Sequence, residues 1–122
     1  MSGHFICHVD IPTDNQEESG KFYGSLFGWK VQPIPQMNYA TFATGEGPGG
    51  GFSQVGESVG AYQLHAGGVL VYISTDDIDA SLAKAESLGG KTVVPKMEIP
   101  TVGWFGIFTD PTGNQVALFT SM

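Results

Sequence analysis

An internal repeat constrains the fold of this chain more than any other feature. Residues 8–33 align with residues 70–95 at a constant offset of 62, without a gap, and 10 of the 26 positions are identical. The identical pairs are Val9/Val71, Ile11/Ile73, Thr13/Thr75, Asp14/Asp76, Ser19/Ser81, Ser25/Ser87, Leu26/Leu88, Gly28/Gly90, Val31/Val93 and Pro33/Pro95. Self-similarity at a fixed spacing is the signature of a repeated structural unit. The chain is therefore expected to contain two copies of one unit.

Each copy begins with a predicted strand followed by a predicted helix. The strands are expected at 5–11 and 69–73, where β-branched and other apolar residues dominate. An acid-rich stretch follows each strand, and Asp and Thr suit a helix N-cap, while early carboxylates complement the helix dipole. Apolar residues then recur at helical spacing until Gly28 in one copy and Gly89-Gly90 in the other, because glycine commonly ends helices.

The remainder of each copy is predicted to form strands joined by turns. These strands are expected at 29–34, 39–44 and 52–55 in the first copy, and at 91–94, 103–109 and 115–119 in the second. The glycine-rich run 45–51 lacks the order of a phosphate-binding loop and is predicted to be a flexible hairpin or pocket-edge loop. Residues 56–68 are interpreted as a linker, with a short strand at 61–64.

Composition narrows the class of partner. The net charge is −7 and all five cationic side chains are lysine, so no basic face exists to displace counterions from nucleic acid. The missing arginine fork also disfavours heavily anionic ligands. No apolar run is long enough for a membrane helix, and the N-terminal residues lack a secretory pattern. With Cys7 as its single cysteine, the chain is expected to be cytoplasmic.

A group of short motifs indicates a family. The chain carries Phe22-Tyr23, Leu26-Phe27-Gly28-Trp29, Leu88-Gly89-Gly90-Lys91 and Phe108-Thr109-Asp110-Pro111-Thr112-Gly113-Asn114, each placed after a strand or at a helix end. With these motifs it resembles the vicinal oxygen chelate superfamily, which includes glyoxalase I, bleomycin-resistance proteins and extradiol dioxygenases. The resemblance extends from about His4 to Phe119 and is closest to small two-module, glyoxalase-like bacterial proteins.

The resemblance implies an α+β fold in which two βαβββ modules form a curved mixed sheet. That sheet half-encloses a pocket, and the helices lie on the outside. We expect one domain over 1–122, with module one at about 4–56, a linker at about 57–68 and module two at about 69–120. Because members often dimerise, and in many the pocket combines both chains, a homodimer is also expected.

The family's metal ligands can be sought by aligning the two copies. Enzymatic members hold a divalent metal with His, Gln or Glu from the first and last strands of the modules, and the metal stabilises developing negative charge. The first-strand positions correspond to His8 and Leu70. The last-strand positions fall at Ala117 and near Phe52, within a register error of one residue. Only His8 can donate a lone pair, so no catalytic metal is predicted.

Three functions remain open from the sequence. The preferred hypothesis is a protein that binds a small, flat or apolar organic molecule in the sheet cavity, contacted by His8, Phe52 and Trp104. The alternative is a lyase, isomerase or dioxygenase whose divalent metal uses His8 as one ligand. The third is a non-catalytic module that dimerises or binds another protein.

Overall fold

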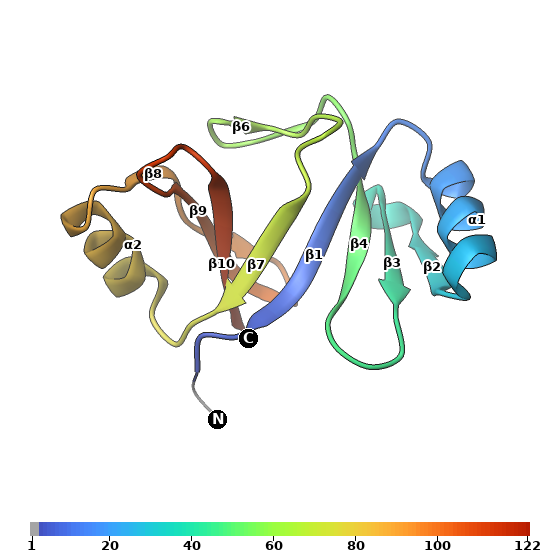
Figure 1. The fold of residues 1–122 in the computed structure, drawn as a ribbon, viewed down its shortest axis with the longest axis horizontal. Helices are drawn as coiled ribbons and strands as arrows, with labels where there is room; N and C mark the ends of the chain where they lie inside the picture. Colours follow the sequence, from blue (N-terminus) through green and yellow to red (C-terminus); the bar gives the residue numbers. More distant parts are fainter. Residues whose placement is uncertain (1–2) are drawn as a thin grey trace. The chain divides into compact units, whose positions relative to one another are not determined.

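The computed structural model describes residues 3–122 and divides the chain into two compact units (Figure 1). We call them the α1 unit and the α2 unit after the helix that each contains. The α1 unit comprises His8–Val59 and Gln63–Val69. The α2 unit comprises Leu70–Met122, Gly60–Tyr62 and the residues up to Cys7.

The α1 unit is a four-stranded mixed sheet with one helix packed on it. Its strand order is β2-β3-β4-β1, in which β4 pairs parallel with β1 and the other neighbours are antiparallel. Helix α1 packs against β2, β3 and β4, as Figure 1 also shows. The elements are β1 (Ile6–Thr13), α1 (Gln16–Phe27), β2 (Lys30–Ile34), the 3-10 turn η1 (Pro35–Met37), β3 (Tyr39–Ala43) and β4 (Gly49–Gln54).

The α2 unit repeats this arrangement. Its strand order is β8-β9-β10-β7, again with one parallel pair, β10 with β7, and α2 packs against β8, β9 and β10. Its elements are β7 (Leu70–Ser74), α2 (Ile78–Ser87), β8 (Lys91–Ile99), β9 (Gly103–Thr109) and β10 (Gln115–Ser121). The short strands β5 (Ser58–Val59) and β6 (Tyr62–Gln63) form a hairpin in the predicted linker. The α+β class, with mixed sheets and two helices, is confirmed.

The two helices begin in the same way. Asn15 caps α1 by accepting a hydrogen bond from the Glu18 backbone N–H, and Asp77 caps α2 by accepting one from the Ala80 N–H, both at 2.9 Å. Asn15 and Asp77 occupy equivalent positions of the repeat. At the end of α1, Gly28 adopts a left-handed φ of 76°, which glycine tolerates without a Cβ penalty.

Identical residues of the repeat make identical contacts just before each helix. The Thr13 hydroxyl hydrogen-bonds the Ser19 hydroxyl at 2.7 Å, and Thr75 bonds Ser81 at 2.8 Å. Each bond ties the end of the first strand to the first turns of its helix. The sequence repeat therefore reflects a repeated physical contact.

The glycine-rich run corrects one sequence prediction. Gly49, Gly50 and Gly51 are part of β4, whereas the sequence pattern predicts a flexible loop for them. A Cβ on Gly50 would overlap the Val9 carbonyl, and a Cβ on Gly51 would overlap the Tyr39 ring. These glycines are therefore required by close packing inside the sheet, which composition alone does not reveal.

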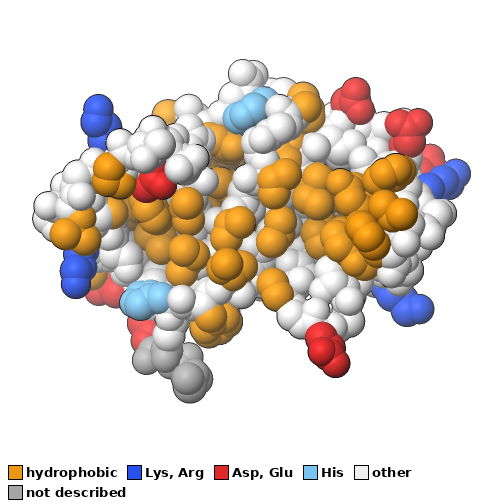
Figure 2. All heavy atoms as spheres, in the orientation of Figure 1, with side chains coloured by type: hydrophobic (Ala, Val, Ile, Leu, Met, Phe, Trp, Pro, Cys, Tyr) orange, Lys and Arg blue, Asp and Glu red, His pale blue; other side chains and the backbone are white. Residues whose placement is uncertain are grey.

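Aromatic rings form the core between α1 and its sheet. Trp29 stacks on Phe42 with 4.5 Å between ring centroids, and Tyr23 stacks on Trp29 at 5.2 Å. Phe52 is fully buried, 5.0 Å from the Phe42 ring centre. Figure 2 shows hydrophobic side chains gathered over β3 and β4 beside α1. These aromatic side chains therefore serve the core of the α1 unit.

Aliphatic side chains form the corresponding core of the α2 unit. Ile78 and Leu82 of α2 are buried against Leu118 of β10, and Trp104 and Phe108 pack on the same cluster. Within residues 3–122, neither helix is long and apolar enough to cross a membrane.

Candidate functional site

The sheet of the α1 unit has two chemically different faces. Ile11 and Phe52 belong to the core beneath α1. Since side chains alternate along a strand, His8 and Asp10 of β1 project from the opposite, non-helical face. The structure thus places two ionisable side chains, two residues apart, on a face that carries no helix of its own unit.

A hydrogen-bonded chain joins these two side chains through Tyr39. The Tyr39 hydroxyl donates to Asp10 Oδ1 at 2.6 Å, and its oxygen lies 2.7 Å from His8 Nε2. A phenol has one proton to give, so its oxygen accepts from the imidazole, and Nε2 carries the hydrogen. His8 Nε2 is 3.9 Å from Asp10 Oδ1, too far for a direct hydrogen bond, so the two side chains are linked through the phenol. We call these three residues the His8–Tyr39–Asp10 chain.

Burial differs between the two ends of this chain. The Asp10 side chain is 6% exposed, whereas the His8 side chain is 32% exposed. A buried carboxylate needs strong hydrogen bonds, because leaving it without them costs several times what the bonds contribute when formed. The arrangement holds the imidazole in one tautomer and one orientation, and presents it at the accessible end.

Two residues of β4 complete this face. Gly51, which pairs with Asp10 in the parallel register, leaves room for the Tyr39 ring to lie over the strand. Ser53 lies two residues further along the same face, and its hydroxyl is buried without a hydrogen-bond partner. A buried hydroxyl without a partner is unusual, and this one is closed off from solvent.

The residues on this face do not fit the family's divalent metal. The strand register pairs Asp10 with Gly51 and Tyr72 with Ala117, so the counterpart of Ala117 in the first copy is Gly51, inside the one-residue error allowed from Phe52. Neither Gly51 nor Ala117 has a side-chain donor atom, and the Nε2 atom of His8 is engaged in a 2.7 Å hydrogen bond with the Tyr39 hydroxyl. Residues 3–122 contain no group of three His, Cys, Asp or Glu side chains placed to hold a metal ion.

Only one of the three predicted ligand contacts lies on this face. His8 does, but Phe52 is fully buried in the core beneath α1, pointing to the opposite face of the sheet. Trp104 belongs to the α2 unit, where its ring packs on the cluster beneath α2 and the Lys96 amine lies 5.3 Å from its centre. The sequence does not single out Asp10 or Tyr39 as site residues. The His-x-Asp pattern on a predicted strand was the available signal for Asp10.

Cys7 lies outside this site. It belongs to the α2 unit, and its thiol contacts the Tyr72 carbonyl at 3.6 Å. Burial raises the pKa of the Cys7 thiol, more than its backbone hydrogen bond lowers it. The thiolate is therefore disfavoured, and Cys7 is a poor nucleophile.

The repeated unit, a mixed four-stranded sheet carrying one helix, defines a glyoxalase-like protein. The chain belongs to the Glyoxalase/Bleomycin resistance protein/Dioxygenase superfamily, whose family model matches residues 5–118. A glyoxylase-like domain-containing protein of Didymella fabae is 31% identical over 121 residues, covering 94% of this chain and 92% of that protein. CFP32 of Mycobacterium tuberculosis is 34% identical over 91% of this chain, and the chain spans only 43% of CFP32.

Solved structures support the same fold. Methylmalonyl-CoA epimerase from Mycobacterium tuberculosis superposes with a TM-score of 0.66 at 14% identity, covering 96% of this chain and 87% of that one. A superfamily member from Vibrio splendidus gives 0.65 at 12% identity, with coverages of 98% and 100%. At these identities the similarity concerns the fold, and function has to be argued from the residues of this chain.

Proposed function

We propose that this protein binds a small organic molecule on the non-helical face of the α1 unit, with His8 as the contacting side chain and without a catalytic metal. The single observation behind the proposal is the His8–Tyr39–Asp10 chain, which runs from a buried carboxylate to an accessible imidazole. Apolar residues would stabilise this part of the sheet without the free-energy cost of burying a charged group. A function is therefore the better reason for the polar chain.

The surroundings favour a flat or largely apolar ligand with a polar group. The imidazole of His8, 32% exposed, offers a polar contact, and the ring of Tyr39 beside it offers an apolar surface. The relative DnrV of Streptomyces peucetius, named an anthracycline biosynthesis protein, is 28% identical over 90% of this chain. Anthracyclines are flat and aromatic, so one belongs in the first panel of test compounds.

The experiment is titration of the purified protein with an anthracycline and a panel of smaller aromatic compounds, followed by calorimetry or ligand fluorescence. Saturable binding is expected, and His8→Ala is expected to weaken it about tenfold, the loss of one good contact. Exposed His65 supplies the matched control, His65→Ala, which should leave the affinity unchanged. If no compound saturates, or both histidine variants bind equally well, the proposal fails.

Metal analysis tests the competing enzyme hypothesis on the same sample. The donor atoms of the His8 face do not fit a divalent ion, so less than stoichiometric metal is expected after addition of nickel, zinc, manganese or iron(II) and dialysis. Stoichiometric metal that disappears in His8→Ala would overturn the proposal. Because superfamily members commonly dimerise, we also expect a homodimer, which light scattering would detect.

A further inference from the structure

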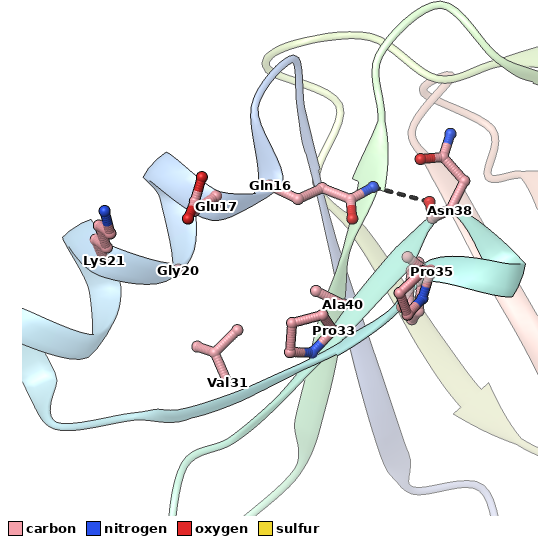
Figure 3. Close-up of a pocket in the computed structure, with 10 residues that line it drawn as sticks. Gln16, Glu17, Gly20, Lys21, Val31, Pro33, Pro35, Asn38 and Ala40 are labelled. Carbon is pink, nitrogen blue, oxygen red and sulfur yellow. Dashed lines mark hydrogen bonds between the residues drawn. The ribbon is translucent and has the colours of Figure 1, made fainter.

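A cavity lies on the opposite, helical face of the same sheet. It occupies about 510 Å³ between the first half of α1 and strands β2 and β3 (Figure 3). Val31, Pro33 and Ala40 form an apolar floor. At one end the Gln16 side chain reaches across to the strands, where its Nε2 donates to the Asn38 carbonyl at 2.8 Å.

The internal repeat explains why this space is open. At the offset of 62, Gln16 corresponds to Ile78 and Gly20 corresponds to Leu82. Ile78 and Leu82 are 1% and 5% exposed and fill the space beneath α2. In the first copy a polar side chain and a glycine replace them, so α1 has no buried residue where α2 has two.

Gly20 is the position at which a missing side chain matters most. A Cβ built on it would lie 3.1 Å from a methyl group of Val31, which is a tight contact, so a larger residue would press on this part of the cavity floor. Glycine inside a helix costs about 1 kcal/mol relative to alanine. Glycine at this position, where the other copy has leucine, lets α1 approach Val31 closely at the expense of helix propensity.

The lining indicates the chemistry of an occupant. The floor is apolar, while the rim carries one carboxylate, Glu17, one amine, Lys21, and the carboxamide of Gln16. Figure 3 shows Glu17 and Lys21 on the helix, pointing away from the strands. The rim thus carries one charge of each sign, and the volume lies within the range of small-molecule sites.

We propose that this cavity is a second binding site, for a neutral apolar molecule of about one or two rings with a single hydrogen-bonding group. Tyr39 lines the cavity and also bonds His8, but Val31 and Ala40 face α1 whereas His8 projects from the other side of the sheet, so the two sites are distinct. The proposal of a binding site in this cavity does not depend on the function proposed for the His8 face.

The test is an amide NMR titration with indole, a neutral ring system with one N–H donor. Saturable shifts are expected at Gly20, Val31 and Ala40. Gly20→Leu restores the side chain of the second copy and should weaken indole binding at least about tenfold, because it occupies the volume that the ring needs. Gln16→Ile makes the same test at the other equivalent position, in case Gly20→Leu does not fold.

Gly24→Ala is the matched control. It also replaces a glycine of α1, but its Cβ meets only the Trp29 carbonyl, at 3.4 Å, so it should leave indole affinity within about twofold. His8→Ala should likewise leave indole binding unchanged, which separates this site from the His8 face. Indole-3-carboxylate should bind more weakly than indole.

The proposal is overturned if indole causes no saturable shifts around the cavity, if the folded Gly20→Leu or Gln16→Ile variant binds indole like the wild type, or if the carboxylate binds as well as the neutral ring. A loss of indole binding in His8→Ala would also refute two separate sites.

Discussion

Removing the Tyr39 hydroxyl tests the physical role of the His8–Tyr39–Asp10 chain. Tyr39→Phe keeps the ring over Gly51 and creates no cavity, so packing contributes little to the change. It deprives the carboxylate of Asp10, whose side chain is 6% exposed, of its 2.6 Å hydrogen bond. A bond to a charged group contributes about 1.5–3 kcal/mol, and water cannot easily replace it at this burial. We therefore expect Tyr39→Phe to lower the free energy of unfolding by about 2–3 kcal/mol.

The measurement is urea unfolding followed by far-ultraviolet circular dichroism. Tyr23→Phe is the control: it removes a phenol hydroxyl from the aromatic core beneath α1 and should cost less than about 0.5 kcal/mol. In the double variant Tyr39→Phe/Asp10→Leu, the orphaned carboxylate is gone, so part of the lost stability should return. The reasoning is refuted if Tyr39→Phe lowers the free energy of unfolding no more than Tyr23→Phe does. It is also refuted if Asp10→Leu lowers the free energy of unfolding of the Tyr39→Phe variant further, as a second independent mutation would.

Three further outcomes are expected. Gly51→Ala should displace the Tyr39 ring and cost about 1–3 kcal/mol in urea unfolding, and an unchanged midpoint would contradict the close packing over β4. Asn15→Ala should lower the free energy of unfolding by about 1 kcal/mol because the N-cap of α1 is lost, and the equivalent change Asp77→Ala should lower it by a similar amount. A negligible loss of stability in both variants would refute the capping contacts. Asp110 has a pKa lowered from its usual 3.8, mainly by the Asn114 side-chain hydrogen bond, so its contribution is present above pH 3.8 and lost as pH falls through the lower folded value. Acid titration of Asp110→Ala should therefore show less stability loss below about pH 4 than the wild type.

The parts of the fold that local chemistry determines could be predicted from the sequence. The end of each first strand and the start of the following helix are indicated by Thr13 and Asn15 in one copy and by Thr75 and Asp77 in the other. The structure uses these residues in this way. Gly28 ends α1 because a left-handed residue is needed there. Each of these features depends on residues within a few positions of one another, so no knowledge of the tertiary structure is required.

The candidate site depends on contacts that sequence spacing does not contain. Tyr39 reaches His8 and Asp10 across β4, 31 and 29 residues away along the chain. From the sequence, Tyr39 is expected to be an ordinary core aromatic residue. Nothing in its neighbours along the chain indicates a role on the non-helical face of the sheet. The cavity beside α1 is different, because the replacement of Ile78 and Leu82 by Gln16 and Gly20 is visible when the two copies of the repeat are aligned.

The glycines of β4 show why a strand can escape prediction. A strand is usually predicted from its side chains, and Gly49–Gly51 has none to alternate. The place of this segment in the sheet depends instead on the residues that cross it, namely Val9, Tyr39 and Phe42. The segment has the composition of a loop and the hydrogen bonding of a strand.

Three glycines in a paired strand also have a consequence for how this sheet assembles. A strand without side chains cannot specify its own alignment, so sliding by one residue meets little resistance within the segment itself. The register is set by other residues. Phe52, which directly follows the three glycines, is buried in the core beneath α1, and the Tyr39 and Phe42 rings occupy the space that a shifted strand would need. The register of β4 is therefore set by its neighbouring strands and by Phe52, and not by its own glycines.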